Sequence, residues 1–106
     1  MGGRLETLKE YLAADPEDSF LLFAIAKEYE KSGDEDNALS YYLKIKTHDP
    51  EYIGLYYHLG KLHERKDDLE LAKAIYYEGI ELAKKTKDFH AAAELSGALQ
   101  AIEMDL

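Results

Sequence analysis

Apolar residues recur along this chain at the spacing of amphipathic helices, in segments separated by short polar breaks. Between residues 19 and 48 they fall three or four positions apart on both sides of the stretch SGDED at 32–36. They are Leu22, Ile25, Ala26 and Tyr29 before the break, and Ala38, Tyr42 and Ile45 after it. Residues 53–86 show the same pattern around a break at KDD. The pattern predicts pairs of helices joined by short turns, with no strand in residues 17–86.

The two halves of this pattern form an internal repeat. When the sequence is aligned with itself at a shift of 34 residues, identical or similar residues coincide at many positions. The matched positions are Pro16 with Pro50, Phe23 with Tyr57, Ile25-Ala26 with Leu59-Gly60, Lys27 with Lys61, Glu30 with Glu64, Ala38 with Ala72, and Tyr42 with Tyr76. Self-similarity at a fixed period is the signature of a repeat architecture.

The repeat resembles the tetratricopeptide repeat, a helix–turn–helix unit of about 34 residues with the pattern W-x₂-L-G-x₂-Y…A-x₃-F…P. The units would be residues 19–52 and 53–86. Matching residues are Tyr29, Ala38, Tyr42 and Pro50 in the first unit, and Tyr56, Leu59, Gly60, Ala72 and Tyr76 in the second. Departures are Ala26 for glycine, Ile45 for a small residue, His63 for tyrosine and Lys84 for proline. The resemblance implies an all-α fold, an α-solenoid of antiparallel helix pairs with about six helices in a right-handed stack.

The ends of the chain are expected to cap this stack within a single domain of residues 1–106. Residues 4–14 form an amphipathic segment, which the register makes the second helix of an incomplete preceding unit. Residues 88–104 form one more helix, and Asp88 suits its N-terminus. Terminal repeats must cover the last apolar face. Lys84, in place of proline, predicts that the preceding helix continues to about Thr86.

Tyr56 and Gly60 lie one helical turn apart and are expected on the inner face of their unit. The missing side chain of Gly60 would let the partner helix approach closely, which offsets a helix-propensity penalty of about 1 kcal/mol. Tyr57 points about 100° away. We expect burial at Leu22, Ile25, Tyr29, Ala38, Tyr42, Tyr56, Leu59, Ala72 and Tyr76.

Gly33 and Asp67 are equivalent by register and follow the first helix of each unit. A left-handed residue commonly ends a helix at this place. Glycine adopts that conformation freely, and Asp tolerates it better than most other residues. We therefore expect a positive φ at both positions or beside them.

Composition narrows the class of function. The chain has 106 residues, a net charge of −9 and no cysteine. Nucleic-acid binding normally requires a basic excess, so neither nucleic acid nor an anionic membrane is expected as a partner. No apolar run approaches the roughly 20 residues of a membrane span. Cytoplasmic location is the default expectation in the absence of a targeting signal.

The residues that carry chemistry do not form a catalytic pattern. The four histidines are His48, His58, His63 and His90. His58 and His63 are five positions apart, about 140° around a helix, so they do not share a metal-binding face. The carboxylates cluster at turns and first helical turns, where they favour the positive helix N-terminus. We expect no enzyme activity, no cofactor and no metal site.

In tetratricopeptide repeats the first helix of each unit lines a concave groove. The resemblance places Phe20, Phe23, Ala24, Lys27, Glu30 and Lys31 there from the first unit, and Gly54, Tyr57, His58, Lys61, Glu64 and Arg65 from the second. The candidate binding residues among them are Phe20, Phe23, Lys27, Lys31, Tyr57, His58, Lys61 and Arg65. The twelve groove positions together include four basic and two acidic residues, a net charge of +2, so the rest of the chain carries −11.

A basic and aromatic groove is typical of a site for an extended peptide or short helix with acidic character. The alternative is that the lysines only balance Glu30 and Glu64, three residues further on. The carboxylate clamp of some family members is not expected, because Lys27 and Lys61 occupy its asparagine positions. The sequence thus predicts an interaction module for a protein or peptide, acidic or C-terminal. The other hypothesis is a self-associating module acting through its helical faces, as monomer or homodimer, since two units are fewer than the roughly three usually needed.

Overall fold

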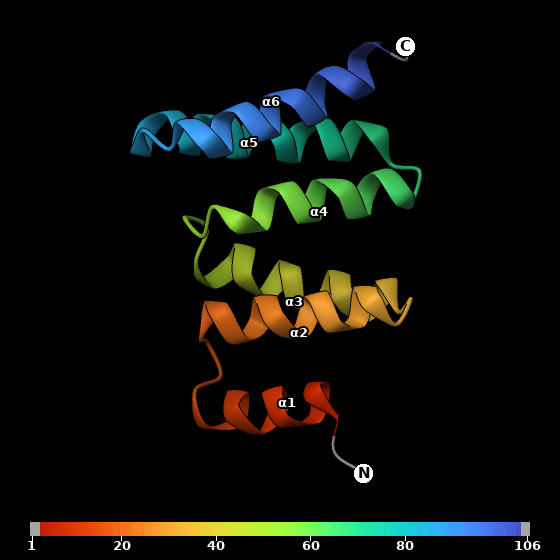
Figure 1. The fold of residues 1–106 in the computed structure, drawn as a ribbon, viewed down its shortest axis with the longest axis vertical. Helices are drawn as coiled ribbons and strands as arrows, with labels where there is room; N and C mark the ends of the chain where they lie inside the picture. The colour runs from red at the N-terminus through yellow and green to blue at the C-terminus, as the bar shows by residue number, and fades with distance from the viewer. Residues whose placement is uncertain (1–2, 105–106) are drawn as a thin grey trace. The chain divides into compact units, whose positions relative to one another are not determined.

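The computed structural model describes residues 3–104, and over that range the chain consists of α-helices with no strand (Figure 1). The helices are α1 (Arg4–Ala14), α2 (Ser19–Lys31), α3 (Glu35–His48), α4 (Gly54–Arg65), α5 (Leu69–Thr86) and α6 (Phe89–Met104). The predicted all-α class with six helices is confirmed for this range. None of these helices is both long and apolar enough to cross a membrane.

The helices belong to two compact units, residues 1–52 with α1 to α3 and residues 53–106 with α4 to α6. In the first unit α2 packs against α3, and α1 packs against α2 (Figure 1). In the second unit α5 packs against both α4 and α6, and α6 also contacts α4. Each unit is thus a helical hairpin with one added helix. The single domain over residues 1–106 stays a prediction.

Four aspartates start helices by accepting a hydrogen bond from a backbone N–H three residues on. The acceptors are Asp18, Asp34, Asp68 and Asp88, and the donors are the N–H groups of Leu21, Asn37, Leu71 and Ala91, at 3.0 to 3.2 Å. Such N-caps satisfy a donor that the helix itself leaves unpaired. The predicted cap at Asp88 is confirmed, and much of the acidity at the turns has this structural role.

The turns within the two repeats have the same geometry. Gly33 has a φ of 83° and Asp67 a φ of 65°, which confirms the prediction of left-handed residues there. The next residue donates back over one turn in each case, Asp34 to the Tyr29 carbonyl and Asp68 to the His63 carbonyl, both at 2.9 Å. A third left-handed residue, Lys87 with a φ of 61°, ends α5. The extension of α5 to Thr86 is confirmed.

Reciprocal tyrosine–glycine packing joins α4 to α5. A Cβ atom placed on Gly60 of α4 would lie 2.2 Å from Cε1 of Tyr76 on α5. A Cβ placed on Gly79 of α5 would lie 2.6 Å from Cβ of Tyr56 on α4. The Tyr76 ring fills the space that Gly60 leaves open, and the base of the Tyr56 side chain, together with Leu95, fills the space at Gly79. Tyr56 and Gly60 have the inward positions that the sequence predicts.

The predicted core is buried at every position except Tyr29. The buried residues are Leu22, Ile25, Ala38, Tyr42, Tyr56, Leu59, Ala72 and Tyr76. Tyr29 is only partly buried and packs against the small cluster that Leu8 of α1 forms with Ala24 and Ile25. The Tyr29 ring lies 5.7 Å from the Tyr41 ring, between centroids, and the Lys9 ammonium lies 5.1 Å from the Tyr29 centroid.

Gly60→Ala should destabilise the chain by about 1–3 kcal/mol, since the added methyl group forces the buried Tyr76 ring to move. Gly97→Ala is the matched control. A Cβ at Gly97 on α6 meets nothing within 4 Å, so this variant should gain about 0.5–1 kcal/mol. Urea denaturation measures both. Equal shifts in the two variants would show that close packing at Gly60 is unimportant.

Asp67→Gly should stabilise the chain by a few tenths to about 1 kcal/mol. The left-handed conformation costs a residue with a side chain roughly 1–2 kcal/mol, and the greater unfolded-state entropy of glycine offsets part of the gain. Gly33→Ala, at the equivalent turn, should destabilise. Denaturation midpoints give both values, and a loss of stability in Asp67→Gly would contradict this account of the turn.

Candidate functional site

In the first unit, the predicted groove residues follow α2 with different exposures. Phe20 is 66% exposed at the start of the helix, and Lys31 is exposed at its end. Phe23 is half-buried, and its ring packs against Tyr42 and Tyr52, at 6.0 and 5.5 Å between centroids. Phe23 is thus partly used in the unit's own packing, while Phe20 offers an open aromatic surface.

In the second unit, the predicted residues form a connected row along α4. The Tyr57 ring meets the His58 ring edge-on at 5.5 Å, and the Lys61 ammonium lies 5.5 Å from the Tyr57 centroid. Lys61 Nζ also lies 3.7 Å from Glu64 Oε2. Arg65, one turn further on, is exposed. Aromatic surface at the start of α4 is followed by positive charge towards its end.

The two glutamates assigned to the groove have a structural partner within their own repeats. The Tyr42 hydroxyl donates to Glu30, and the Tyr76 hydroxyl donates to Glu64. Burial, together with the bond to Glu64, raises the pKa of the Tyr76 hydroxyl well above its ordinary value. Because these carboxylates are already engaged by buried tyrosines, they are poorly placed to receive a ligand.

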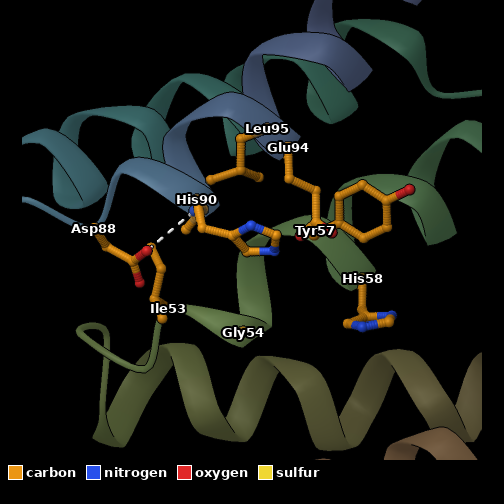
Figure 2. Close-up of a pocket in the computed structure, with 9 residues that line it drawn as sticks. Ile53, Gly54, Tyr57, His58, Asp88, His90, Glu94 and Leu95 are labelled. Carbon is orange, nitrogen blue, oxygen red and sulfur yellow. Dashed lines mark hydrogen bonds between the residues drawn. The ribbon is translucent and has the colours of Figure 1, made fainter.

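A pocket of about 200 Å³ lies between α4 and α6, and we call it the α4–α6 pocket. Its lining residues are Ile53, Gly54, Tyr57 and His58 from the α4 side, and Asp88, His90, Ala91, Glu94 and Leu95 from the α6 side (Figure 2). It brings together three predicted groove positions, Gly54, Tyr57 and His58, and does not include Lys61, Glu64 or Arg65.

The contribution of α6 was missed from the sequence, where residues 88–104 were interpreted only as a cap. The signal was present, because Asp88 lies 34 residues after Gly54. The register therefore makes α6 the first helix of a third unit, which is the position that lines a groove. Asp88 and Glu94 also make this pocket more acidic than the two-unit set suggested. The grouping of the residues from both repeats on one concave face stays a prediction.

The histidines have separate environments. His63 is 7% exposed, and burial lowers the pKa of its imidazole, as suits a neutral packing residue in place of the family's tyrosine. His48 Nδ1 lies 3.5 Å from Glu17 Oε2 at the surface. His58 and His90 line the α4–α6 pocket. Across residues 3–104 no group of three or more acidic or histidine side chains is arranged to hold a metal ion.

Paired helices that repeat their turns, their tyrosine–glutamate bonds and their apolar positions after 34 residues define a helical repeat protein. A family model described as a tetratricopeptide repeat matches residues 21–52 and 53–86. The chain belongs to the tetratricopeptide repeat family, whose members are typically protein–protein interaction modules.

Relatives with this fold occur among bacterial proteins. A TPR repeat-containing protein of Pseudomonas aeruginosa is 26% identical over 99 residues, which cover 93% of this chain and 94% of that protein. The crystal structure of a tetratricopeptide repeat domain protein from Salinibacter ruber is 37% identical, with a TM-score of 0.77, over 81% of this chain and 96% of that one. PcrH, solved in complex with the chaperone binding region of PopD, is 19% identical with a TM-score of 0.86, over 95% of this chain and 77% of its own, and shares the fold.

Proposed function

We propose that this chain is a non-enzymatic interaction module that holds a segment of a partner protein along the first helices of its repeats. The supporting observation is the row on α4, where Tyr57, Lys61 and Arg65 follow one another towards the helix end and Tyr57 borders the α4–α6 pocket. Half-buried aromatic rings offer large contact area with little rotamer entropy to lose. Such a surface is better suited to binding a peptide than to catalysing a reaction.

The charge of the bound segment follows from the basic side chains. Lys61 and Arg65 on α4 favour acidic side chains or a C-terminal carboxylate, and in the first unit Lys27 and Lys31 on α2 favour the same chemistry. Glu30 and Glu64 oppose this preference weakly, since each already accepts a hydrogen bond from a buried tyrosine. PcrH, which binds the chaperone binding region of PopD, is a precedent for a segment held by this fold.

An array of random nonapeptides with free C-termini should yield acidic ligands of micromolar affinity, as is typical of small sites with exposed charges. Tyr57→Ala should abolish most of the binding. Lys61→Ala should weaken it and flatten its dependence on salt, because exposed charges are screened. Isothermal titration of the best peptides measures both effects.

Two variants on α5 serve as controls of the same residue types. Tyr77 is 51% exposed there, and Lys73 pairs with Glu70 at 3.0 Å. Tyr77→Ala and Lys73→Ala should leave peptide affinity unchanged. If the controls weaken binding as much as the α4 variants, or if no peptide binds, the proposed function is wrong.

One observation favours a second function, self-association. The α6 surface opposite its buried face exposes Phe89 at 75% and Met104 at 84%. The small residues Ala93, Gly97 and Ala101 lie between them and are also exposed. At about 100° per residue, all five fall within an arc of roughly 120°, which also holds the exposed polar residues His90 and Gln100. A largely apolar helix face of this kind suits a second copy of the same chain.

Self-association predicts a concentration-dependent species of twice the 12.1 kDa of one chain. Light scattering over a dilution series measures the mass. Phe89→Ser should restore the monomer, because it removes the largest exposed apolar side chain of this face. Tyr11→Ser, a change on α1 at a residue that is 60% exposed, should not. A monomer at every concentration would eliminate this second function and leave the first.

A further inference from the structure

We propose that the α4–α6 pocket is a subsite for one lysine or arginine side chain of the bound segment. The inference rests on the proposed function, since it assigns the charge of a ligand that lies along α4. It also gives that ligand a polarity, with positive charge beside the start of α4 and negative charge beside Lys61 and Arg65 towards its end.

The size of the pocket suits a single side chain. Its volume of about 200 Å³ is below the roughly 300–1,000 Å³ of sites for drug-sized molecules. Ile53, Ala91 and Leu95 supply apolar surface, and Tyr57 supplies an aromatic ring (Figure 2). Lysine and arginine have long aliphatic stems that bury against such surface while the charged head stays near water. An ammonium or guanidinium group close to the Tyr57 ring also gains a cation–π attraction.

The pocket is lined by two carboxylates, and one of them has no partner within the described residues. The Glu94 side chain is exposed at the pocket, and its carboxylate has no hydrogen bond or ion pair with another residue of the described range 3–104. Asp88 adds a second carboxylate, of which Oδ1 caps the Ala91 N–H at 3.0 Å. Lys61, the cation beside Tyr57, already lies 3.7 Å from Glu64. The Glu94 carboxylate is therefore not paired with a cationic side chain, and it lies beside the Tyr57 ring and the apolar part of the pocket.

The charge of the whole chain acts in the same direction. A net charge of −9 attracts cationic groups at distances up to about a Debye length, roughly 8–10 Å at physiological salt. The net negative charge of the chain would repel a segment that carried only negative charge. A segment with one basic anchor residue and acidic residues further along α4 can pair with Glu94 and with Lys61 and Arg65 at the same time.

Acetyl-arginine amide and acetyl-citrulline amide are suitable probes, because citrulline has the shape of arginine without its charge. In a two-dimensional NMR titration, the arginine probe should shift the backbone signals of Tyr57 and Glu94 more strongly than the citrulline probe does. Glu94→Gln should remove this difference. Glu81→Gln, the same charge change at an exposed residue of α5, should keep it. Equal shifts from both probes would overturn the proposal.

The nonapeptides selected from the array extend the test to the complete ligand. Replacing their basic anchor by citrulline should reduce affinity about two- to fivefold, the range expected for a solvent-accessible ion pair. In Glu94→Gln the replacement should have no effect. If peptides bind along α4 but this replacement is without effect in the unaltered chain, the subsite is wrong and the proposed function stands. If no peptide binds but the arginine probe does, the proposed function fails, and only the preference of the pocket for a basic side chain stands.

Discussion

Gly79 of α5 is the point at which side chains from two other helices meet. A Cβ atom at this position would lie 2.6 Å from Cβ of Tyr56 on α4 and 2.8 Å from Cδ1 of Leu95 on α6. Only a residue without a side chain leaves room for both. A glycine in mid-helix has a helix-propensity penalty of about 1 kcal/mol. The close contact of α5 with both α4 and α6 at Gly79 offsets this penalty. The geometry of the second unit depends on that contact.

The α4–α6 pocket is a consequence of the same contact. Tyr56 packs against Gly79, and its neighbour Tyr57, about 100° further around α4, lines the pocket. Leu95, the other side chain at Gly79, forms part of the pocket wall, one residue after Glu94. A packed three-helix unit therefore presents an aromatic ring and an unengaged carboxylate at defined positions. Binding residues held on rigid elements lose less entropy when a ligand arrives.

The sequence predicts most of the fold because its signals are local or periodic. The shift of 34 residues places the helices, and Gly33 and Asp67 indicate the turns. Contacts between helices were harder to predict. The bond from Tyr76 to Glu64 joins separate helices and has no local signal, and the left-handed turn at Lys87 has no glycine to mark it. The α6 half of the pocket was missed because residues 88–104 depart from the repeat pattern, although they keep its register.

Hydrogen exchange in Gly79→Ala tests the central claim most directly, namely that Gly79 seats both α4 and α6 on α5. The added methyl group should displace Leu95 and Tyr56, at a cost of about 1–3 kcal/mol, so that amides within Phe89–Met104 exchange about tenfold faster or more. Gly97→Ala, on the open side of α6, should leave those rates unchanged or slow them. Unchanged protection of α6 in Gly79→Ala would contradict the account.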